Sequence, residues 1–141
     1  LGKKAPDWTL TDTADKTLSL KDMQSKVVML QFTSVSCGPC RVSIQFLNEL
    51  TSTYNKKDFD FAAIECTANS MNAVKFYQTK TGINYKFLKS DKPVLKDYEI
   101  RSFPVFFILD QNRKIRHIIN GYGKGTTDKE IRNIVDKMIK S

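Results

Sequence analysis

The sequence of 141 residues predicts a single α/β domain, residues 1–141, with a central mixed β-sheet flanked by helices. Short apolar runs rich in β-branched and aromatic residues alternate along the chain with segments of three- and four-residue apolar spacing, the pattern of strands alternating with helices. The chain closes with two strand-like runs around a turn and an amphipathic helix, so part of the sheet should be antiparallel. A chain of this length can bury a core without cross-links or metals.

The first predicted strand and helix meet at a pair of cysteines. Residues 27–32 form a short, mostly apolar run that predicts a buried strand. Apolar residues at spacings of three and four then mark one face of a helix that opens at the pair: Val42, Phe46, Leu47, Leu50 and Tyr54. Cys37 and Cys40 therefore lie at a strand-to-helix junction.

The middle of the chain continues the alternation. Residues 59–66 and 85–88 predict two strands around a helix at Met71–Thr81, which Gly82 closes. A short helix is predicted over residues 93–98, because proline is favoured at a helix start.

The last part of the chain predicts a hairpin and a helix. Residues 105–109 and 115–119 read as strands around a turn at residues 110–112. Thr127 and Glu130 have the spacing of a capping box. An apolar stripe then predicts the final helix: Ile131, Ile134, Val135, Met138 and Ile139.

Composition narrows the class of protein. The chain has 40% hydrophobic and 27% charged residues, as ordinary globular domains do. Its net charge of +8 comes from lysines scattered along the chain, which indicates a solvated basic surface, so no nucleic-acid partner is expected. No apolar run approaches the roughly 18–20 residues that span a bilayer, and no charged-then-apolar leader opens the chain at Leu1. A leader or membrane anchor ahead of Leu1 is a hypothesis only.

Cys37-Gly38-Pro39-Cys40 is the strongest chemical signal. A two-residue spacer at a helix start places two sulfurs close enough to alternate between dithiol and disulfide. The unpaired N–H groups and the positive end of the helix dipole favour a thiolate on Cys37. Pro39 suits the first turn, where its missing N–H costs no intrahelical bond.

Two other interpretations of the pair are weaker. As a structural staple, a four-residue disulfide ring contributes only about 2 kcal/mol of loop entropy, against nearly 5 for a ring of about a hundred residues. A zinc site needs further ligands, and only Cys66 and His117 remain. A redox role without metal or cofactor is favoured, with Cys66 read as a small buried apolar side chain and His117 as exposed or structural.

The cysteine segment resembles thioredoxin, whose active site has the same four residues in the same strand-to-helix position. Ala5-Pro6-Asp7-Trp8-Thr9-Leu10, Leu18-Ser19-Leu20 and Lys26-Val27-Val28 resemble the lead-in of the ResA and TlpA branch of thioredoxin-like proteins, which peroxiredoxin relatives share. The resemblance spans essentially the whole chain. It implies a thioredoxin-like fold with an N-terminal extension and a helix-containing insert from about Cys66 to Ser90.

The resemblance also implies roles for residues around the pair. Pro104, which precedes a late strand, should form a cis peptide bond, face the cysteines and take part in catalysis. The residues expected to contact the partner are Ser36, Gly38, Pro39 and Phe103. Glu65 should end a buried strand, where a hydrogen-bonded or exposed carboxylate is the favoured interpretation and a proton relay the alternative.

Three residues depart from the thioredoxin pattern. Ser36 replaces the tryptophan before the first cysteine, Thr33 replaces another aromatic residue, and Gln31 stands where thioredoxin has a buried aspartate. These changes alter the contact surface beside Cys37 and remove one proton acceptor.

By resemblance, the chain is a thiol:disulfide oxidoreductase whose Cys37 thiolate attacks a partner disulfide and whose Cys40 resolves the mixed disulfide. The Gly-Pro spacer favours reductase or isomerase work. The resemblance implies an extracytoplasmic, often membrane-tethered protein that receives electrons from a membrane carrier and acts on apocytochrome c or other disulfide-containing or thiol proteins; we expect a monomer.

Three alternatives remain open. A thiol peroxidase would need a Pro- and Thr-bearing loop, which Ser34-Val35-Ser36 lacks. A thioredoxin-like binding module would present the Phe103-Pro104 groove with inert cysteines. A copper-handling protein is disfavoured by the single histidine.

Overall fold

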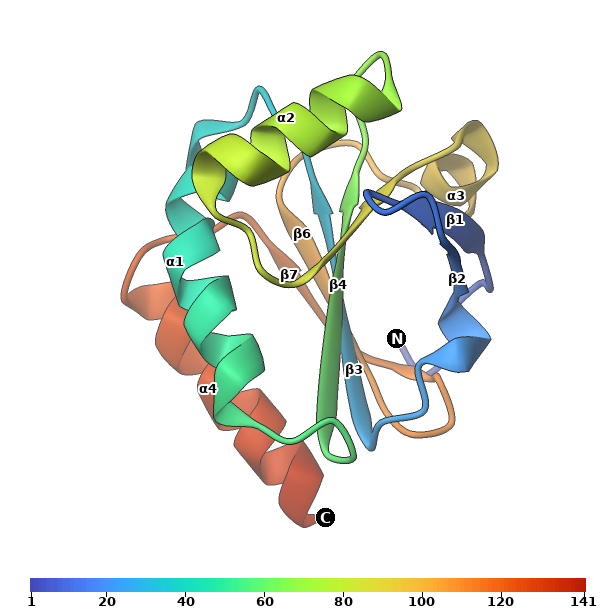
Figure 1. The fold of residues 1–141 in the computed structure, drawn as a ribbon. Helices are drawn as coiled ribbons and strands as arrows, with labels where there is room; N and C mark the ends of the chain where they lie inside the picture. Colours follow the sequence, from blue (N-terminus) through green and yellow to red (C-terminus); the bar gives the residue numbers. More distant parts are fainter.

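A computed structural model describes all 141 residues, which form a seven-stranded mixed sheet with helices on both faces (Figure 1). The strands are β1 (Thr9–Asp12), β2 (Thr17–Ser19), β3 (Val27–Thr33), β4 (Phe59–Glu65), β5 (Lys86–Lys89), β6 (Val105–Leu109) and β7 (Ile115–Asn120). The helices are the 3-10 turn η1 (Leu20–Asp22), α1 (Gly38–Thr53), α2 (Met71–Thr81), α3 (Lys92–Asp97) and α4 (Thr126–Lys140).

The sheet mixes two kinds of strand pairing, in the order β2-β1-β5-β4-β3-β6-β7. The central strands β3, β4 and β5 are parallel, and α1 and α2 make the crossovers that parallel neighbours require. β6, β7 and the β1–β2 hairpin join by antiparallel pairing. This arrangement confirms the predicted thioredoxin-like fold with a mixed central sheet.

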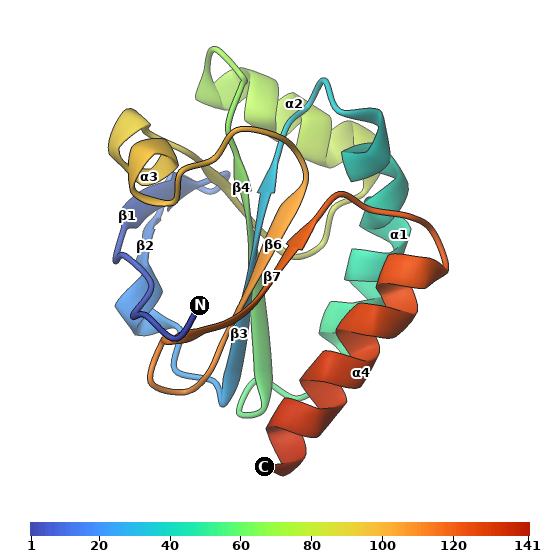
Figure 2. The ribbon, with the colours of Figure 1, turned by 180° about the vertical axis from the view of Figure 1, so that it is seen from behind.

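The core lies on both faces of the sheet. Alternate residues of β3 point to opposite sides, so Val27 and Met29 pack in the cluster under α1 and α4, whereas Val28, Leu30 and Phe32 pack in the other cluster. α1 and α4 lie side by side on one side of the molecule, and α3 with the β1–β2 hairpin lies on the other (Figure 2). None of the helices has the length and apolar character needed to cross a bilayer.

The N-terminal extension adds two strands that periodicity did not predict. β1 and β2 have only 4 and 3 residues, too short for a clear alternation. β1 pairs with β5 through Thr11 and Asp12, which extends the sheet past its parallel centre. Trp8 and Leu20 are buried in the core on this side and hold the hairpin against the sheet.

The prediction for the apolar face of α1 was wrong at Val42. Val42 is 53% exposed, and the buried stripe consists of Cys40, Ser43, Ile44, Phe46, Leu47 and Leu50. Tyr54 is the C-cap residue of the helix, and its side chain packs against the same core as predicted. The packing of α1 against the sheet decides which of its residues are buried. The buried face includes Ser43, a polar residue that a search for apolar spacing leaves out.

The capping box predicted for the last helix was also wrong. α4 begins at Thr126, which places Thr127 inside the first turn, where its Oγ1 accepts a hydrogen bond from the Gly123 N–H (2.9 Å). The carboxylate that caps the helix belongs to Asp128, which accepts from the Gly125 N–H (3.2 Å). Gly125 has φ of +86°, a conformation that favours glycine, and the helix begins two residues earlier than expected.

Candidate active site

Cys37 and Cys40 lie at the start of α1, directly after the loop that leaves β3. Cys37 is the N-cap residue, and its Sγ accepts a hydrogen bond from the Cys40 N–H (3.2 Å). The two side chains form a disulfide with the Cα atoms 5.3 Å apart, within the ordinary range for such a bond. Cys37 is half-buried, whereas Cys40 is only 2% exposed. An incoming molecule can therefore reach Cys37, and Cys40 is shielded behind it.

The electrostatics at Cys37 favour a negative charge. The first-turn N–H groups of α1 and the helix dipole present positive partial charge to the N-cap side chain. No acidic residue lies in the first turn, and the residue after Cys40 is the cation Arg41. Reduction of the disulfide thus leaves Cys37 where its thiolate is stabilised.

Hydrogen bonds hold the loop in front of Cys37. The Cys37 N–H donates to the Ser34 carbonyl (3.1 Å), and the Ser36 N–H donates to Ser34 Oγ (3.1 Å). Ser34 Oγ also pairs with Thr67 Oγ1 (2.6 Å), in the loop that follows β4. The cysteine loop is therefore tied to the neighbouring strand end.

Glu65 joins the two loops through hydrogen bonds. Its carboxylate is 1% exposed and accepts hydrogen bonds from the N–H groups of Val35 (3.0 Å), Thr67 (3.1 Å) and Ala68 (2.8 Å). The Thr67 hydroxyl donates a further bond (3.1 Å). A buried carboxylate needs such partners, and these contacts favour the hydrogen-bonded interpretation of Glu65 over the relay.

Pro104 lies at the same end of the sheet as the cysteine loop. The Phe103–Pro104 peptide bond is cis, as the resemblance implied. β6 pairs with β3 so that Val105 lies opposite Phe32, which places Pro104 beside the end of β3. The Pro104 carbonyl accepts from the Gly121 N–H (2.8 Å), and Phe103 is half-buried. Of the other predicted contact residues, Ser36, Gly38 and Pro39 are exposed around the pair.

Sequence reasoning missed Ser43, which is fully buried below Cys40. Its hydroxyl donates to the Cys40 carbonyl (2.6 Å) and accepts from Gln31 Nε2 (3.2 Å). Gln31 is 1% exposed, on the face of β3 that α1 covers. A neutral, hydrogen-bonded pair thus occupies the interior next to Cys40. A polar residue three positions after Cys40 was the available signal, because that spacing returns to the same helix face.

Two candidates remain, Cys66 and His117, and Cys66 is not bonded to either cysteine of the pair. Cys66 is a free, half-buried thiol whose Sγ donates to the Ile64 carbonyl (3.3 Å). Burial, followed by the negative charge of Glu65, raises the pKa of Cys66 to about 12. His117 is exposed on the edge strand β7. No group of three His, Cys, Asp or Glu side chains is arranged to hold a metal ion.

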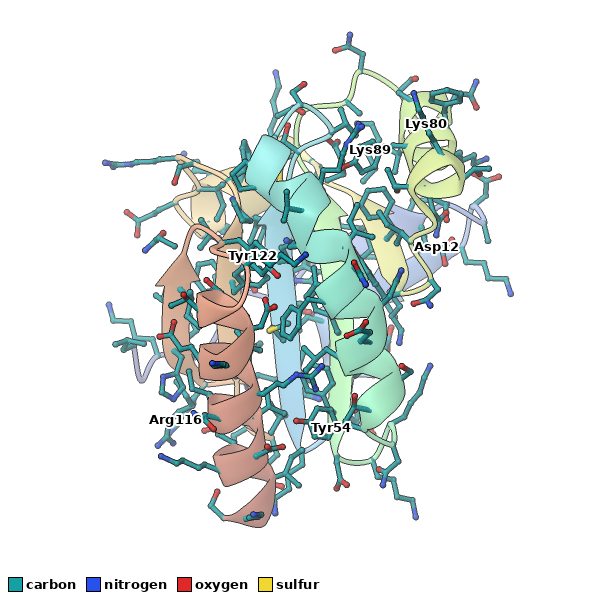
Figure 3. All side chains as sticks on the ribbon, turned by 90° about the vertical axis from the view of Figure 1, so that its left-hand side faces the viewer. Asp12, Tyr54, Lys80, Lys89, Arg116 and Tyr122 are labelled. Atoms are coloured by element: carbon teal, nitrogen blue, oxygen red, sulfur yellow. A yellow bond between two sulfur atoms is a disulfide. The ribbon has the colours of Figure 1, made fainter.

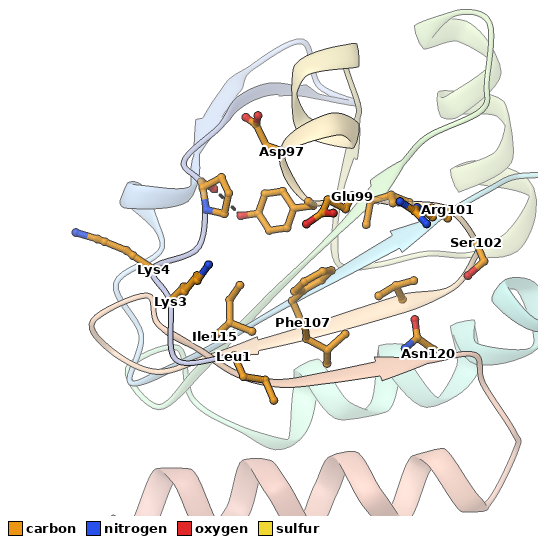
Figure 4. Close-up of a pocket in the computed structure, with 15 residues that line it drawn as sticks. Leu1, Lys3, Lys4, Asp97, Glu99, Arg101, Ser102, Phe107, Ile115 and Asn120 are labelled. Carbon is orange, nitrogen blue, oxygen red and sulfur yellow. Dashed lines mark hydrogen bonds between the residues drawn. The ribbon is translucent and has the colours of Figure 1, made fainter.

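A cavity of about 730 Å³ lies on the face of the sheet that α1 does not cover (Figure 4). Its floor includes Val105 and Phe107, and Arg101 and Ser102 line it just before the Phe103–Pro104 bond. Tyr98 forms a wall and donates from its hydroxyl to the Pro6 carbonyl (2.5 Å). The cavity does not include the cysteines.

Comparison with known proteins gives a consistent set of relatives. The family model described as Redoxin matches residues 1–135. The thiol-disulfide oxidoreductase ResA of Geobacillus thermodenitrificans is 30% identical over 122 residues, which cover 86% of this chain and 70% of the relative. ResA of Bacillus subtilis is 26% identical over 121 residues, 85% of this chain and 67% of the relative.

Solved structures share the fold. A Chlorobium tepidum protein that carries the name thiol:disulfide interchange protein DsbE superposes with a TM-score of 0.88 at 24% identity, over 98% of this chain and 96% of that one. A thiol:disulfide interchange protein from Bacteroides sp. superposes with a TM-score of 0.83 at 22% identity, over 99% and 90% of the two chains.

Proposed function

The chain belongs to the Redoxin family and is a thiol-disulfide oxidoreductase similar to ResA, and on that premise we propose that it reduces or isomerises disulfides in extracytoplasmic proteins. The observation that carries the proposal is the unequal burial of the two sulfurs at one helix start. Cys37 is the N-cap and reachable, whereas Cys40 is 2% exposed. This asymmetry suits an attacking and a resolving cysteine.

The reaction runs in two exchange steps. The Cys37 thiolate attacks one sulfur of the partner disulfide, forms a mixed disulfide and releases the other partner sulfur as a thiolate, which takes up a proton. The Cys40 thiol then loses its proton to solvent, and the resulting thiolate attacks the Cys37 sulfur. The second partner sulfur leaves as a thiolate and takes up a proton. Two electrons pass from the enzyme dithiol to the partner, and the Cys37–Cys40 disulfide is the product.

The surroundings of the pair support its proposed partner contacts. Ser36, Gly38, Pro39 and Phe103 border the loop and the Pro104 end of β6, where an extended partner segment would lie. Glu65 holds the loop before Cys37 through its hydrogen bonds, and a proton relay by its carboxylate is the secondary proposal for this residue. The Gly38-Pro39 spacer resembles that of reducing thioredoxins and favours reduction. From the similarity to ResA, we propose that a membrane-bound donor supplies the electrons and that the substrates include apocytochrome c.

The experiment is a redox titration of the Cys37–Cys40 pair against glutathione and dithiothreitol buffers, with Cys37→Ser as the control. A reversible couple near about −270 mV supports a reductase, and one above about −180 mV supports an isomerase or oxidase. A pair that never cycles would overturn the proposal and leave the binding module.

A further inference from the structure

A shallow groove of about 650 Å³ runs along the outer face of α1, immediately after the cysteines. It lies between the end of α2 and the loop that joins β7 to α4, and Figure 3 looks onto α1 with Lys80 on one side and Tyr122 on the other. The residues that matter here are Arg41, Val42, Gln45, Lys80, Thr81 and Lys124, and we call this surface the α1 groove.

The α1 groove is cationic and unneutralised. Three of its lining residues, Arg41, Lys80 and Lys124, are positively charged, and none is acidic. The ion pairs of the protein use other residues, so these three cations have no carboxylate partner. Their fields therefore add along the groove and favour a negatively charged occupant.

Two of the cations are held by aromatic rings of α2. The Arg41 guanidinium lies 5.4 Å from the centroid of the Tyr77 ring, and Lys80 Nζ lies 5.8 Å from the centroid of Phe76. These contacts limit the freedom that each side chain would lose on binding a carboxylate. The charges are thus partly arranged in advance of a partner.

One apolar side chain is exposed in the α1 groove, and another lies beside it in contact with Lys80. Val42 is 53% exposed and Phe76 is 67% exposed, the latter one turn before Lys80 on α2. An exposed aliphatic residue in a groove that cations line fits a segment with both acidic and apolar side chains better than a free anion does. The occupant is therefore a polypeptide.

Distance links the groove to the redox pair. Gln45 follows Cys37 by eight positions, or about 12 Å along a helix. An extended chain covers that length in about four residues. A partner whose cysteine is joined to Cys37 would therefore place its next few residues on the α1 groove.

We propose that the α1 groove selects partner proteins that carry acidic side chains within about four residues of the disulfide-bonded cysteine. This inference rests on the proposed function, since it names the partner of the same cysteines. Arg41, Lys80 and Lys124 bind the carboxylates, and Val42 contacts an apolar residue between them.

The test uses two disulfide-linked peptides of equal length, one with three glutamates within four residues of the cysteine and one with glutamines in their place. The reduced wild-type protein is mixed with each, and the rate constant of Cys37–Cys40 oxidation is measured at low and high salt. We expect the acidic peptide to react about five- to tenfold faster at low salt, and the two rates to converge near 1 M salt, where screening acts within about 3 Å.

The matched variants separate the groove from the overall charge. Lys80→Gln with Lys124→Gln should bring the ratio of the two rates close to one. Lys56→Gln with Lys57→Gln removes the same charge from two exposed lysines in the turn between α1 and β4, and should keep the ratio. Equal rates for both peptides in the wild-type protein, or an equal loss in both variants, would overturn the inference.

Two further outcomes are distinct. If neither peptide oxidises the wild-type dithiol, the proposed function fails and this inference with it. If sedimentation shows a dimer that the Lys80 and Lys124 substitutions dissociate, the groove binds a second copy of the chain, which also overturns the acidic-partner assignment.

Discussion

The protein carries cysteines after the ends of two neighbouring parallel strands, Cys37 after β3 and Cys66 after β4, and only Cys37 has surroundings that favour a reactive thiolate. β3 and β4 pair in register so that Thr33 lies opposite Glu65, and Cys66 donates its N–H to the Thr33 carbonyl (2.9 Å). After β3 the chain turns directly into α1 with Cys37 as N-cap; after β4 it passes through a loop before α2 begins at Met71.

The contrast shows that a position at this edge of the sheet is not enough to make a cysteine reactive. Cys37 lies at the start of α1, where the Cys40 N–H donates to its Sγ and the helix dipole stabilises a thiolate. Cys66 is surrounded by apolar contacts and the Glu65 carboxylate, and both raise its pKa. The start of a helix, rather than the end of a strand, distinguishes the reactive sulfur from the inert one.

The largest expected effect is the loss of activity on replacing Cys37. Cys37→Ser should lower the rate of insulin disulfide reduction by more than about a thousandfold, because no other thiolate is reachable. Cys66→Ala is the control and should stay within about twofold of wild type. A large loss in Cys66→Ala, with unchanged circular dichroism, would show that the two strand ends cooperate.

The next effect concerns the reactivity of Cys66 itself. With the pair oxidised, Cys66 is the only free thiol. A pKa of about 12 leaves little thiolate at pH 8, so alkylation by iodoacetamide should be about a thousandfold slower than for a free cysteine. The same reaction in guanidinium chloride should be complete, and fast labelling of the folded protein would contradict the contrast.

The raised pKa of Cys66 also predicts how stability changes with pH. The folded thiol keeps its proton to a higher pH than the unfolded one, whose pKa has the ordinary cysteine value of about 9.0. The stabilisation is therefore fully present below about pH 9 and is lost as pH rises towards about 12. Urea unfolding of wild type and Cys66→Ala between pH 8 and pH 10.5 should show a steeper loss for wild type.

A smaller effect separates the two interpretations of Glu65. Glu65→Gln removes a charged acceptor from the N–H groups of Val35, Thr67 and Ala68, and should lower the free energy of unfolding by about 2–4 kcal/mol. Glu49→Gln, an exposed change on α1, is the control. A relay would instead shift the pH profile of turnover while stability stayed near that of wild type.

The smallest expected effect lies below Cys40. Ser43→Ala deletes the hydroxyl that bridges the Cys40 carbonyl and Gln31 Nε2, and should lower the free energy of unfolding by about 1–2 kcal/mol. Ser52→Ala removes an exposed hydroxyl from the same helix and should change it by less than about 0.5 kcal/mol. Equal losses of unfolding free energy in the two variants would mean that the hydrogen bonds of Ser43 to Gln31 and Cys40 add no stability.

Much of this arrangement could be predicted from the sequence. Strong periodic patterns located β3, α1, β4, α2, β6 and β7 to within one or two residues, the usual scatter of element ends. The cysteine spacing and the helix that follows located the redox pair. The weak signals failed: β1 and β2 are too short to show a period, and Val42 follows the apolar spacing yet faces solvent.

The sequence by itself determined which residues form strands and helices and which cysteines form the pair, because these depend on spacing along the chain. Only the tertiary structure decided what surrounds them. Glu65 meets Val35, and Ser43 meets Gln31, because parallel pairing of β3 with β4 and packing of α1 on the sheet bring them within hydrogen-bond distance. Such contacts join residues that share no local pattern, so only the folded chain reveals them.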